Sequence, residues 1–515
     1  MYPGAYVNTT PDKPAVIEAS TGRVTTFKEL DGRSADLAAA LHALGLRKGD
    51  VIAFVSDNRS EAYEIYWAAV RSGLYVVPVN RHLVADEVAY IVRDSGARVV
   101  FASAGLKDLA EKLVPLIPNV TARYVFGGQA EGYLPYLDLL AQAGPRLEDQ
   151  PRGSDMPYSS GTTGRPKGIK PSLPPIQVDQ PGDPITGILA NLFKVDASAV
   201  YLSPAPVYHT APLKWGTAVQ ALGGTVVILD RFDAETFLAA IEKYGVTITQ
   251  VVPTMFVRLL QLPEDARAAY DVSSLRLAVH AAAPCAPEVK RAMIEWWGPT
   301  LFEYYGASEQ HGMSMISAPE WLEKPGSVGK HGLGVAHIIG EDGQELPAGE
   351  IGLIYFERET VPFEYHNDPE KTAQSQLPGA PNWTTVGDIG YIDADGYLFI
   401  TGRKAFTIIS GGVNIYPQEI EDILTLHPAI YDVGVIGVPD AEFGQSVKAV
   451  VQLREGVEPS ADLAQEIIDY VRERIAHFKA PRTVDFVDDL PRTPTGKLVK
   501  RKIEERYAEP AGAAR

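Results

Sequence analysis

One short segment carries the residue types that bind a polyphosphate. From Tyr158 to Gly168 the chain reads YSSGTTGRPKG, with three glycines, four serine or threonine hydroxyls and one lysine. Glycines let backbone N–H groups wrap a polyanion, hydroxyls add donors and lysine adds a positive charge. A Walker A loop needs Gly-Lys-Ser/Thr at the start of a helix, whereas here Pro166 precedes Lys167. The composition therefore suits a triphosphate held in another way.

Further motifs combine groups that suit nucleotide chemistry. An aromatic face followed by a hydroxyl and a carboxylate suits adenine stacking beside a Mg²⁺–phosphate contact. A carboxylate after a glycine can accept both ribose hydroxyls, and adjacent glycines let a thin substrate arm pass close to the backbone. A flexibly mounted lysine can offset developing negative charge. These four features occur, in this order, in Tyr304–Glu309 (YYGASE), Trp383–Asp388 (WTTVGD), Ser410–Pro417 (SGGVNIYP) and Pro491–Lys497 (PRTPTGK).

Together these motifs resemble those of the AMP-forming, adenylate-forming enzymes, which include acyl-CoA synthetases, luciferases and peptide-synthetase adenylation domains. The resemblance runs from Pro11-Asp12-Lys13 to Lys497 and is greatest to bacterial fatty-acyl-CoA and bile-acid-type acyl-CoA ligases. It implies a ligase that activates a carboxylic acid through an acyl-adenylate and then forms the CoA thioester, releasing AMP and pyrophosphate. A medium- or long-chain fatty acid or a steroid side-chain acid is the expected substrate, with ATP and coenzyme A as co-substrates and Mg²⁺ as cofactor.

The resemblance also implies a role for each motif residue. Lys497 would be the adenylation lysine, Glu309 a catalytic Mg²⁺ ligand joined by Thr163, and His209 the gate of the acyl site. The expected ATP and AMP ligands are Ser159, Ser160, Gly161, Thr162, Thr163, Gly164, Lys167, Ala283, Pro284, Tyr305, Gly306, Ser308, Asp388 and Arg403. Coenzyme A would pass Gly411 and Gly412. The expected walls of the acyl pocket are Trp215, His280, Ala281 and Met313.

The chain departs from the family pattern at a few positions. Ala281-Ala282 stands where relatives often have two glycines, which would narrow the passage there, and Ser308 replaces the commoner threonine while keeping the hydroxyl. Ala405 and Phe406 follow Arg403 where polar residues are usual, so a polar interaction at the hinge is not expected.

The pattern of elements predicts more than one domain, because a single core stops growing near ~250–300 residues and this chain has 515. Alternating strands and helices predict an α/β fold with parallel sheets covered on both faces, and turn-rich segments near 340–400 predict a small antiparallel region. By resemblance, residues 1–402 form a large domain of αβαβα layers with a distorted β-barrel, and residues 403–515 form a mobile α+β domain. The strands expected in the large domain are Val51–Val55, Tyr75–Val79, Val99–Ala102, Thr225–Leu229, Thr247–Val252 and Leu275–Val279.

Composition narrows the partners. A net charge of −18 argues against a nucleic-acid partner. The single cysteine, Cys285, leaves no intrachain disulfide and no cysteine-based metal site. Neither a signal peptide nor an apolar run long enough to span a membrane is evident, so we expect a cytoplasmic protein. A homodimer is compatible with the sequence.

Three alternatives remain open at this level. The chain could be an aryl-CoA ligase that differs only in its pocket, or an acyl-AMP ligase that loads a carrier protein. It could also be a nucleotide-binding regulator without activity, although the joint presence of Glu309, Asp388 and Lys497 argues against that.

Overall fold

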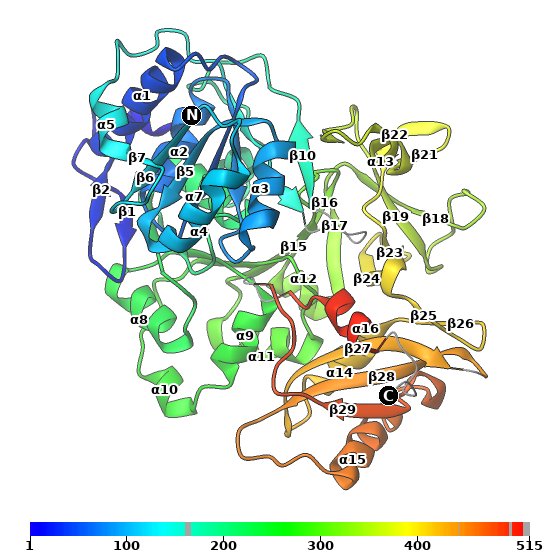
Figure 1. The fold of residues 1–515 in the computed structure, drawn as a ribbon. Coiled ribbons are helices and arrows are strands. Elements are labelled where there is room, and N and C mark those ends of the chain that lie inside the picture. Colours follow the sequence, from blue (N-terminus) through cyan, green and yellow to red (C-terminus); the bar gives the residue numbers. More distant parts are fainter. Residues whose placement is uncertain (160–165, 441, 494–496, 508–515) are drawn as a thin grey trace.

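The structure is a computed structural model that describes residues 1–159, 166–440, 442–493 and 497–507 (Figure 1). Five predicted nucleotide ligands, Ser160, Gly161, Thr162, Thr163 and Gly164, lie outside these residues. In the described part of the chain no helix is long and apolar enough to cross a membrane.

Two sheets form the frame of the large domain. The smaller sheet is parallel and has the strand order β7-β6-β5-β3-β4-β8. Its centre consists of β3 (Val51–Val55), β4 (Tyr75–Val79), β5 (Ala97–Ser103) and β6 (Ala122–Phe126). The larger sheet contains a parallel run of β1 (Pro14–Glu18), β12 (Thr225–Ile228), β11 (Val200–Ser203), β13 (Ile248–Val251), β14 (Leu277–His280) and β15 (Leu301–Gly306). The predicted parallel α/β architecture is confirmed.

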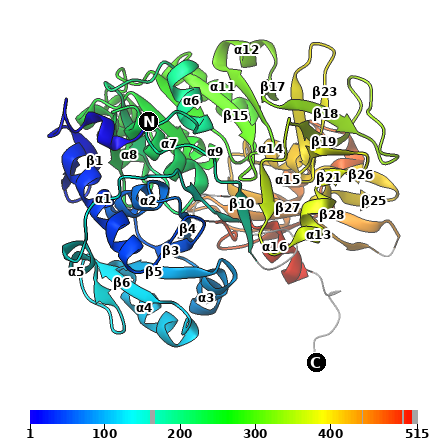
Figure 2. The same cartoon turned by 90° about the horizontal axis from the view of Figure 1, so that it is seen from above.

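Helices fill the space between the sheets and cover both outer faces. The central core contains α1 (Phe27–Ala43), α2 (Glu61–Val70) and α7 (Thr210–Ala221). The smaller sheet is covered by α3 (Ala85–Asp94) and α4 (Lys107–Leu113), and the larger by α8 (Ala234–Tyr244), α9 (Pro253–Leu260) and α11 (Pro287–Trp297). Figure 2 shows α3 and α4 on one side of the domain and α11 on the other. The two sheets, the helices between them and the helices on both outer faces make up the five αβαβα layers expected.

The larger sheet continues beyond β15 as antiparallel strands. β16 (Met313–Ser317) returns along β15, and β17 (Ser327–Leu333) leads into the predicted antiparallel region. That region contains β18 (Val335–Ile339), β19 (Gly352–Glu357), β22 (Ala380–Thr384), β23 (Asp388–Ile392) and β24 (Leu398–Arg403). A separate small sheet joins β9 (Tyr158–Ser159), β10 (Lys167–Pro171) and β20 (Phe363–Tyr365).

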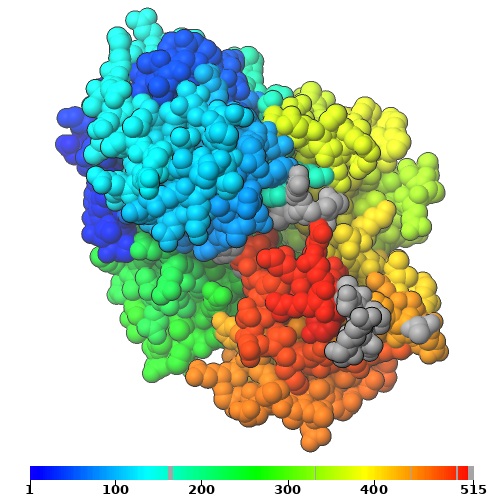
Figure 3. Space-filling view, viewed as in Figure 1, coloured from blue at the N-terminus to red at the C-terminus, as the bar shows by residue number. Residues whose placement is uncertain are grey.

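The C-terminal part has its own apolar core. It contains β25 (Ile408–Ser410), β26 (Val413–Ile415), β27 (Ile430–Asp440), β28 (Gly444–Leu453) and β29 (Thr483–Phe486), packed with α14 (Pro417–Leu424) and α15 (Ala461–Arg472). The last described residues, 497–507, also pack with this part of the structure. In α16 (Lys500–Tyr507), Ile503 is buried and Lys500 pairs with Glu421 at 2.8 Å. Figure 3 shows the orange and red C-terminal surface lying against the large domain.

Candidate active site

The end of β15 separates two environments. Successive residues on a strand face opposite sides. Tyr304 stacks on Trp215 of α7 with ring centres 6.4 Å apart, whereas Tyr305 faces Asp388. The strand ends at Gly306, opposite Met313 of β16. In open α/β sheets this carboxyl edge of the parallel strands is where ligands bind. The predicted motif Tyr304–Glu309 therefore lies at the expected edge.

Asp388 already has a partner for each carboxylate oxygen. The Tyr305 hydroxyl donates to Oδ2 at 2.6 Å, and Nε of Arg403 donates to Oδ1 at 2.7 Å. Asp388 is 5% exposed, whereas the side chain of Arg403 is 48% exposed. Burial, followed by the charge of Asp388, raises the pKa of Tyr305 well above its ordinary value. A carboxylate accepts up to about four hydrogen bonds, so acceptor capacity remains for a ribose.

A second cluster joins Glu309 to Tyr365 of β20 and to Lys167 of β10. The Tyr365 hydroxyl donates to Oε1 of Glu309 at 2.9 Å, and the Tyr365 ring lies 5.9 Å from Nζ of Lys167. Lys167 pairs with Asp368 at 3.2 Å. The backbone N–H of Lys371, and then Lys167, lower the pKa of Asp368. Sequence reasoning missed Tyr365 and Asp368. The one local signal was Asp368-Pro369, a helix start, which indicates no role at a site.

The charges of Arg403, Asp388 and Glu309 act on the ammonium group of Lys497. By solvent accessibility Lys497 is an exposed residue, although its ammonium group lies close enough to the protein to lose part of its hydration. Desolvation, followed by the charge of Arg403, lowers its pKa to about 8, while Asp388 and Glu309 act in the opposite direction. The C-terminal domain thus brings a cation to the cluster formed by the large domain.

His209 is neutral in this setting. It precedes α7, and its ring centre is 4.4 Å from that of Tyr208. Burial and then the charge of Lys497 lower its pKa to about 3. Its Nε2 is buried and has no hydrogen-bond partner among the described residues. Next to it, the hydroxyls of Thr210 and Ser308 are 3.4 Å apart, which links α7 to the motif after β15.

Two of the four predicted pocket walls come together. Trp215 and Met313 line one apolar pocket with Phe193, Phe302, Tyr304, Met315 and two isoleucines of α6 (Pro184–Asn191). Its free volume is only about 10 Å³. His280 is not among the lining residues. It faces α9 and α11 across the sheet, with its ring 5.3 Å from that of Phe256 and its Nε2 3.7 Å from Glu303. Ala281 is buried and also does not line this pocket.

The loop after β14 holds an unusual backbone conformation. Ala282 has φ +76°, the left-handed region that favours glycine. This is one of the positions where the family pattern has glycine, so the methyl group is accommodated in a conformation that L side chains rarely adopt. Ala283 is half-buried and Pro284 is exposed.

Gly411 and Gly412 form the two-residue turn between β25 and β26, with φ +58° and +80°. A turn of this kind needs left-handed backbone at both central positions, which glycine supplies. Both glycines are exposed at the hairpin tip.

The donor set fits a Mg²⁺ ion that is mostly held by phosphate. Within the described ranges, no three His, Cys, Asp or Glu side chains form a group that could hold a metal. Glu309 is 9% exposed, and in that same part of the chain no hydrogen bond reaches its second oxygen, Oε2. Mg²⁺ usually takes one or two carboxylates together with substrate phosphates and waters. The free Oε2 of Glu309 can supply one such carboxylate ligand.

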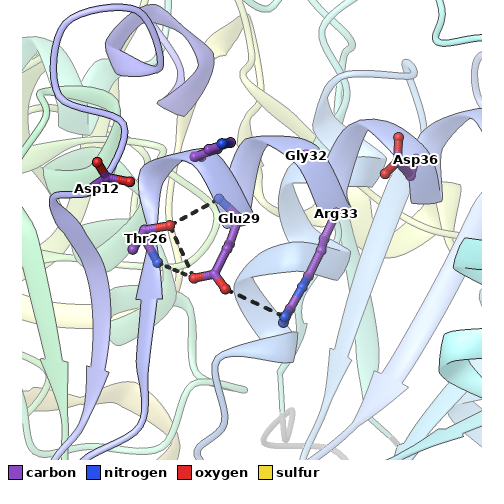
Figure 4. Close-up of a pocket in the computed structure, with 7 residues that line it drawn as sticks. Asp12, Thr26, Glu29, Gly32, Arg33 and Asp36 are labelled. Atoms are coloured by element: carbon purple, nitrogen blue, oxygen red, sulfur yellow. Dashed lines mark hydrogen bonds and ion pairs between the residues drawn. The ribbon is translucent and has the colours of Figure 1, made fainter.

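A hollow of about 480 Å³ lies elsewhere, on the surface at the start of α1 (Figure 4). Its walls include Thr26 and Glu29, which form a capping box at the start of α1, and Arg33. The predicted site residues do not line it.

Comparison with known proteins defines the class. The chain matches the family model described as AMP-binding enzyme over residues 5–366 and that described as AMP-binding enzyme C-terminal domain over residues 419–497. It is 31% identical to the fatty acid–[acyl-carrier-protein] ligase ScoC of Streptomyces coeruleorubidus, covering 96% of this chain and 94% of that one. It is 32% identical to a feruloyl-CoA synthase of Amycolatopsis sp, covering 94% of each.

Among solved structures, the anthranilate CoA ligase AuaEII in complex with anthranoyl-AMP superposes with a TM-score of 0.84. The two chains are 27% identical, and the match covers 98% of this chain and 96% of that one. Fold and motifs together define an adenylate-forming enzyme. The chain belongs to the AMP-binding enzyme family, in the branch of acyl-CoA, acyl-carrier-protein and aryl-CoA ligases.

Proposed function

We propose that this protein uses ATP to join a carboxylic acid to the thiol of coenzyme A through an acyl-adenylate. The observation that carries the proposal is the position of Lys497. Its ammonium group comes from the C-terminal domain, yet the charges that act on it are those of Arg403, Asp388 and Glu309. A cation held there can stabilise charge that develops when the α-phosphate is attacked.

In the first half-reaction, a carboxylate oxygen attacks the α-phosphorus of ATP. The bond from that phosphorus to the bridging oxygen breaks, and pyrophosphate leaves. Asp388 and Tyr305 would hold the nucleoside, and Lys167 would exchange Asp368 for phosphate. Glu309 would hold Mg²⁺, which when bound neutralises phosphate charge. Positioning and charge neutralisation are the main protein contributions to such transfers.

In the second half-reaction, the thiol sulfur attacks the acyl carbonyl carbon. The bond from this carbon to the AMP oxygen breaks, AMP leaves, and the thiol proton passes to solvent. We propose that residues 403–515 rotate about Arg403–Phe406, which withdraws Lys497 and brings the Gly411-Gly412 hairpin to the site. The separate apolar core of the C-terminal part and the exposed hairpin support this rotation.

Transfer to a carrier protein is a second candidate for the acceptor. It is supported by the match of 96% of this chain to the fatty acid–[acyl-carrier-protein] ligase. The names of the relatives include both fatty and aromatic acids, so they leave the acid open.

His209, neutral and with a buried unpaired nitrogen, suits a gate better than a proton donor.

The proposal is tested by separating the half-reactions. Lys497→Ala should abolish acid-dependent ATP–pyrophosphate exchange but retain thioester formation from supplied acyl-AMP and CoA. Lys502→Ala changes an exposed lysine of α16, is the matched control and should retain both half-reactions. Equal loss of both half-reactions in Lys497→Ala would count against the role of Lys497. Exchange without any CoA-dependent turnover would favour the carrier-protein acceptor.

A further inference from the structure

The apolar pocket beside the motif Tyr304–Glu309 is lined mainly by aromatic and methionine side chains. Four of its lining side chains are aromatic and two are methionines. Phe193 and Phe302 pack edge to face with ring centres 4.8 Å apart, and Phe193 lies 6.3 Å from Trp215. Trp215 and Tyr304 are nearly parallel, at 18°. Aromatic pairs in such arrangements gain stability beyond their buried area, so a ring that enters the pocket can make the same kind of contact.

The walls leave little room. The free volume of about 10 Å³, counted as space for the centre of a water-sized sphere, is close to the ~10–15 Å³ that a single water molecule needs. An acid can enter only if side chains move. Met313 and Met315 are the flexible walls, because methionine has an unbranched, adaptable side chain. Trp215 is 3% exposed and packs in the central core between the sheets. Turning the methionines opens a slot beside fixed rings, whereas a tunnel for a long chain requires the core itself to open.

Among the described residues that line the pocket, none carries a charge that could hold a second carboxylate. The nearest buried cation along α7 is Lys214, which pairs with Asp155 and lies 3.9 Å from Asp183. These carboxylates raise the pKa of Lys214 although burial opposes the charge. Lys290, across the sheet, is bound to Glu303 at 2.5 Å. Both cations are neutralised by protein carboxylates.

The path from this pocket to the nucleotide side is short. Tyr304 lies in the pocket, and Gly306, two residues further along β15, has no side chain to block the strand edge. Two residues of a strand span about 7 Å. A ring held against Tyr304 can therefore present its carboxylate near Ser308 through only a few bonds.

From this geometry we infer that the activated acid is a compact monocarboxylic acid with an aromatic ring, of about the size of phenylacetate or cinnamate. It favours the aryl-CoA alternative over the fatty or steroid side-chain acid expected from the sequence. The inference rests on the proposed function, because it assigns the acid that the ligase activates.

The test compares acids in ATP–pyrophosphate exchange with the full chain. The probes are phenylacetate, cinnamate, octanoate, palmitate and glutarate. We expect kcat/KM for the better aromatic acid to exceed that for palmitate and glutarate by about 100-fold. Met315→Ala, which removes a flexible wall, should narrow the gap between octanoate and the aromatic acids. Trp296→Phe, on α11 across the sheet, is the control and should leave the order unchanged.

Direct binding separates this inference from the proposed function. Each acid is titrated without ATP while tryptophan fluorescence is recorded in the wild type and in Trp215→Phe. Quenching by an aromatic acid that is reduced in Trp215→Phe supports the pocket assignment. Exchange that is fastest with palmitate or octanoate overturns the inference but keeps the ligase. Aromatic-acid binding without exchange overturns the ligase but keeps the pocket, and absence of both overturns both.

Discussion

The Tyr305 hydroxyl and Oδ2 of Asp388 are joined by a 2.6 Å hydrogen bond that links the end of β15 to the start of β23. The same carboxylate is held by Arg403 at the end of β24. Besides the backbone pairing through β16, β17 and β24, this side-chain hydrogen bond therefore connects the parallel part of the sheet to the antiparallel region. It also orients the carboxylate proposed to hold the ribose.

Removing this hydrogen bond should weaken ATP binding. Tyr305→Phe keeps the ring but loses a charge-assisted bond worth about 1.5–3 kcal/mol, so we expect KM for ATP to rise about 10-fold or more. ATP–pyrophosphate exchange at varied ATP measures it. Tyr304→Phe, on the other face of the strand, should change KM for the acid instead. If the KM for ATP is the same in Tyr305→Phe as in the wild type, the assignment of Asp388 and Tyr305 to nucleotide binding is wrong.

Adenylation should lose activity as the pH rises through about 8. The ammonium of Lys497 has its pKa lowered to about 8, so its charge disappears on the alkaline side of that value. Because kcat/KM reports groups of the free enzyme, its pH profile for pyrophosphate exchange should show this limb. Thioester formation from supplied acyl-AMP should lack it. In Lys497→Arg, whose guanidinium stays charged, the limb should vanish. A limb that persists there belongs to another group.

Tyr365 should set the Mg²⁺ requirement through Glu309. Tyr365→Phe removes the hydroxyl that donates to Oε1 of Glu309 at 2.9 Å, so this carboxylate is no longer held in a fixed orientation. Loss of such a supporting contact weakens metal binding by about 10-fold or more. We expect the Mg²⁺ concentration at half-maximal exchange to rise by that factor. The matched control is Tyr244→Phe at the end of α8. An unchanged Mg²⁺ dependence in Tyr365→Phe would separate Tyr365 from the metal.

Ala282→Gly should stabilise the protein. A non-glycine residue with positive φ costs on the order of 1–2 kcal/mol, part of which glycine gives back as chain entropy. With φ +76° at Ala282, we expect a net gain of about 0.5–1 kcal/mol in the free energy of unfolding, measured by urea denaturation. Ala283→Gly, whose φ is not positive, should destabilise by a similar amount. If both variants lose stability, the strain is absent.

Much of the framework could be predicted from local sequence. The runs Val51–Val55 and Tyr75–Val79 are strands with those bounds, because continuous β-branched runs can only be buried in a sheet covered on both faces. Thr26 and Glu29 form a capping box, and its Thr-x-x-Glu pattern can be read from the sequence because its contacts span one helical turn. The strand expected at Leu275–Val279 is shifted to Leu277–His280, because its ends depend on the neighbouring strands.

The sequence by itself determined the fold class and the motif residues, because both depend on short-range patterns of residue type. Only the tertiary structure decided which side chains meet. Tyr365 reaches Glu309 across 56 positions of the chain, a contact no local pattern encodes. His280 and Trp215 looked equivalent as apolar-pocket walls, yet His280 on β14 faces α9, whereas Trp215 on α7 packs at the other face of that sheet. The face of a strand residue is set by its pairing register, and register follows from the packing of the whole sheet.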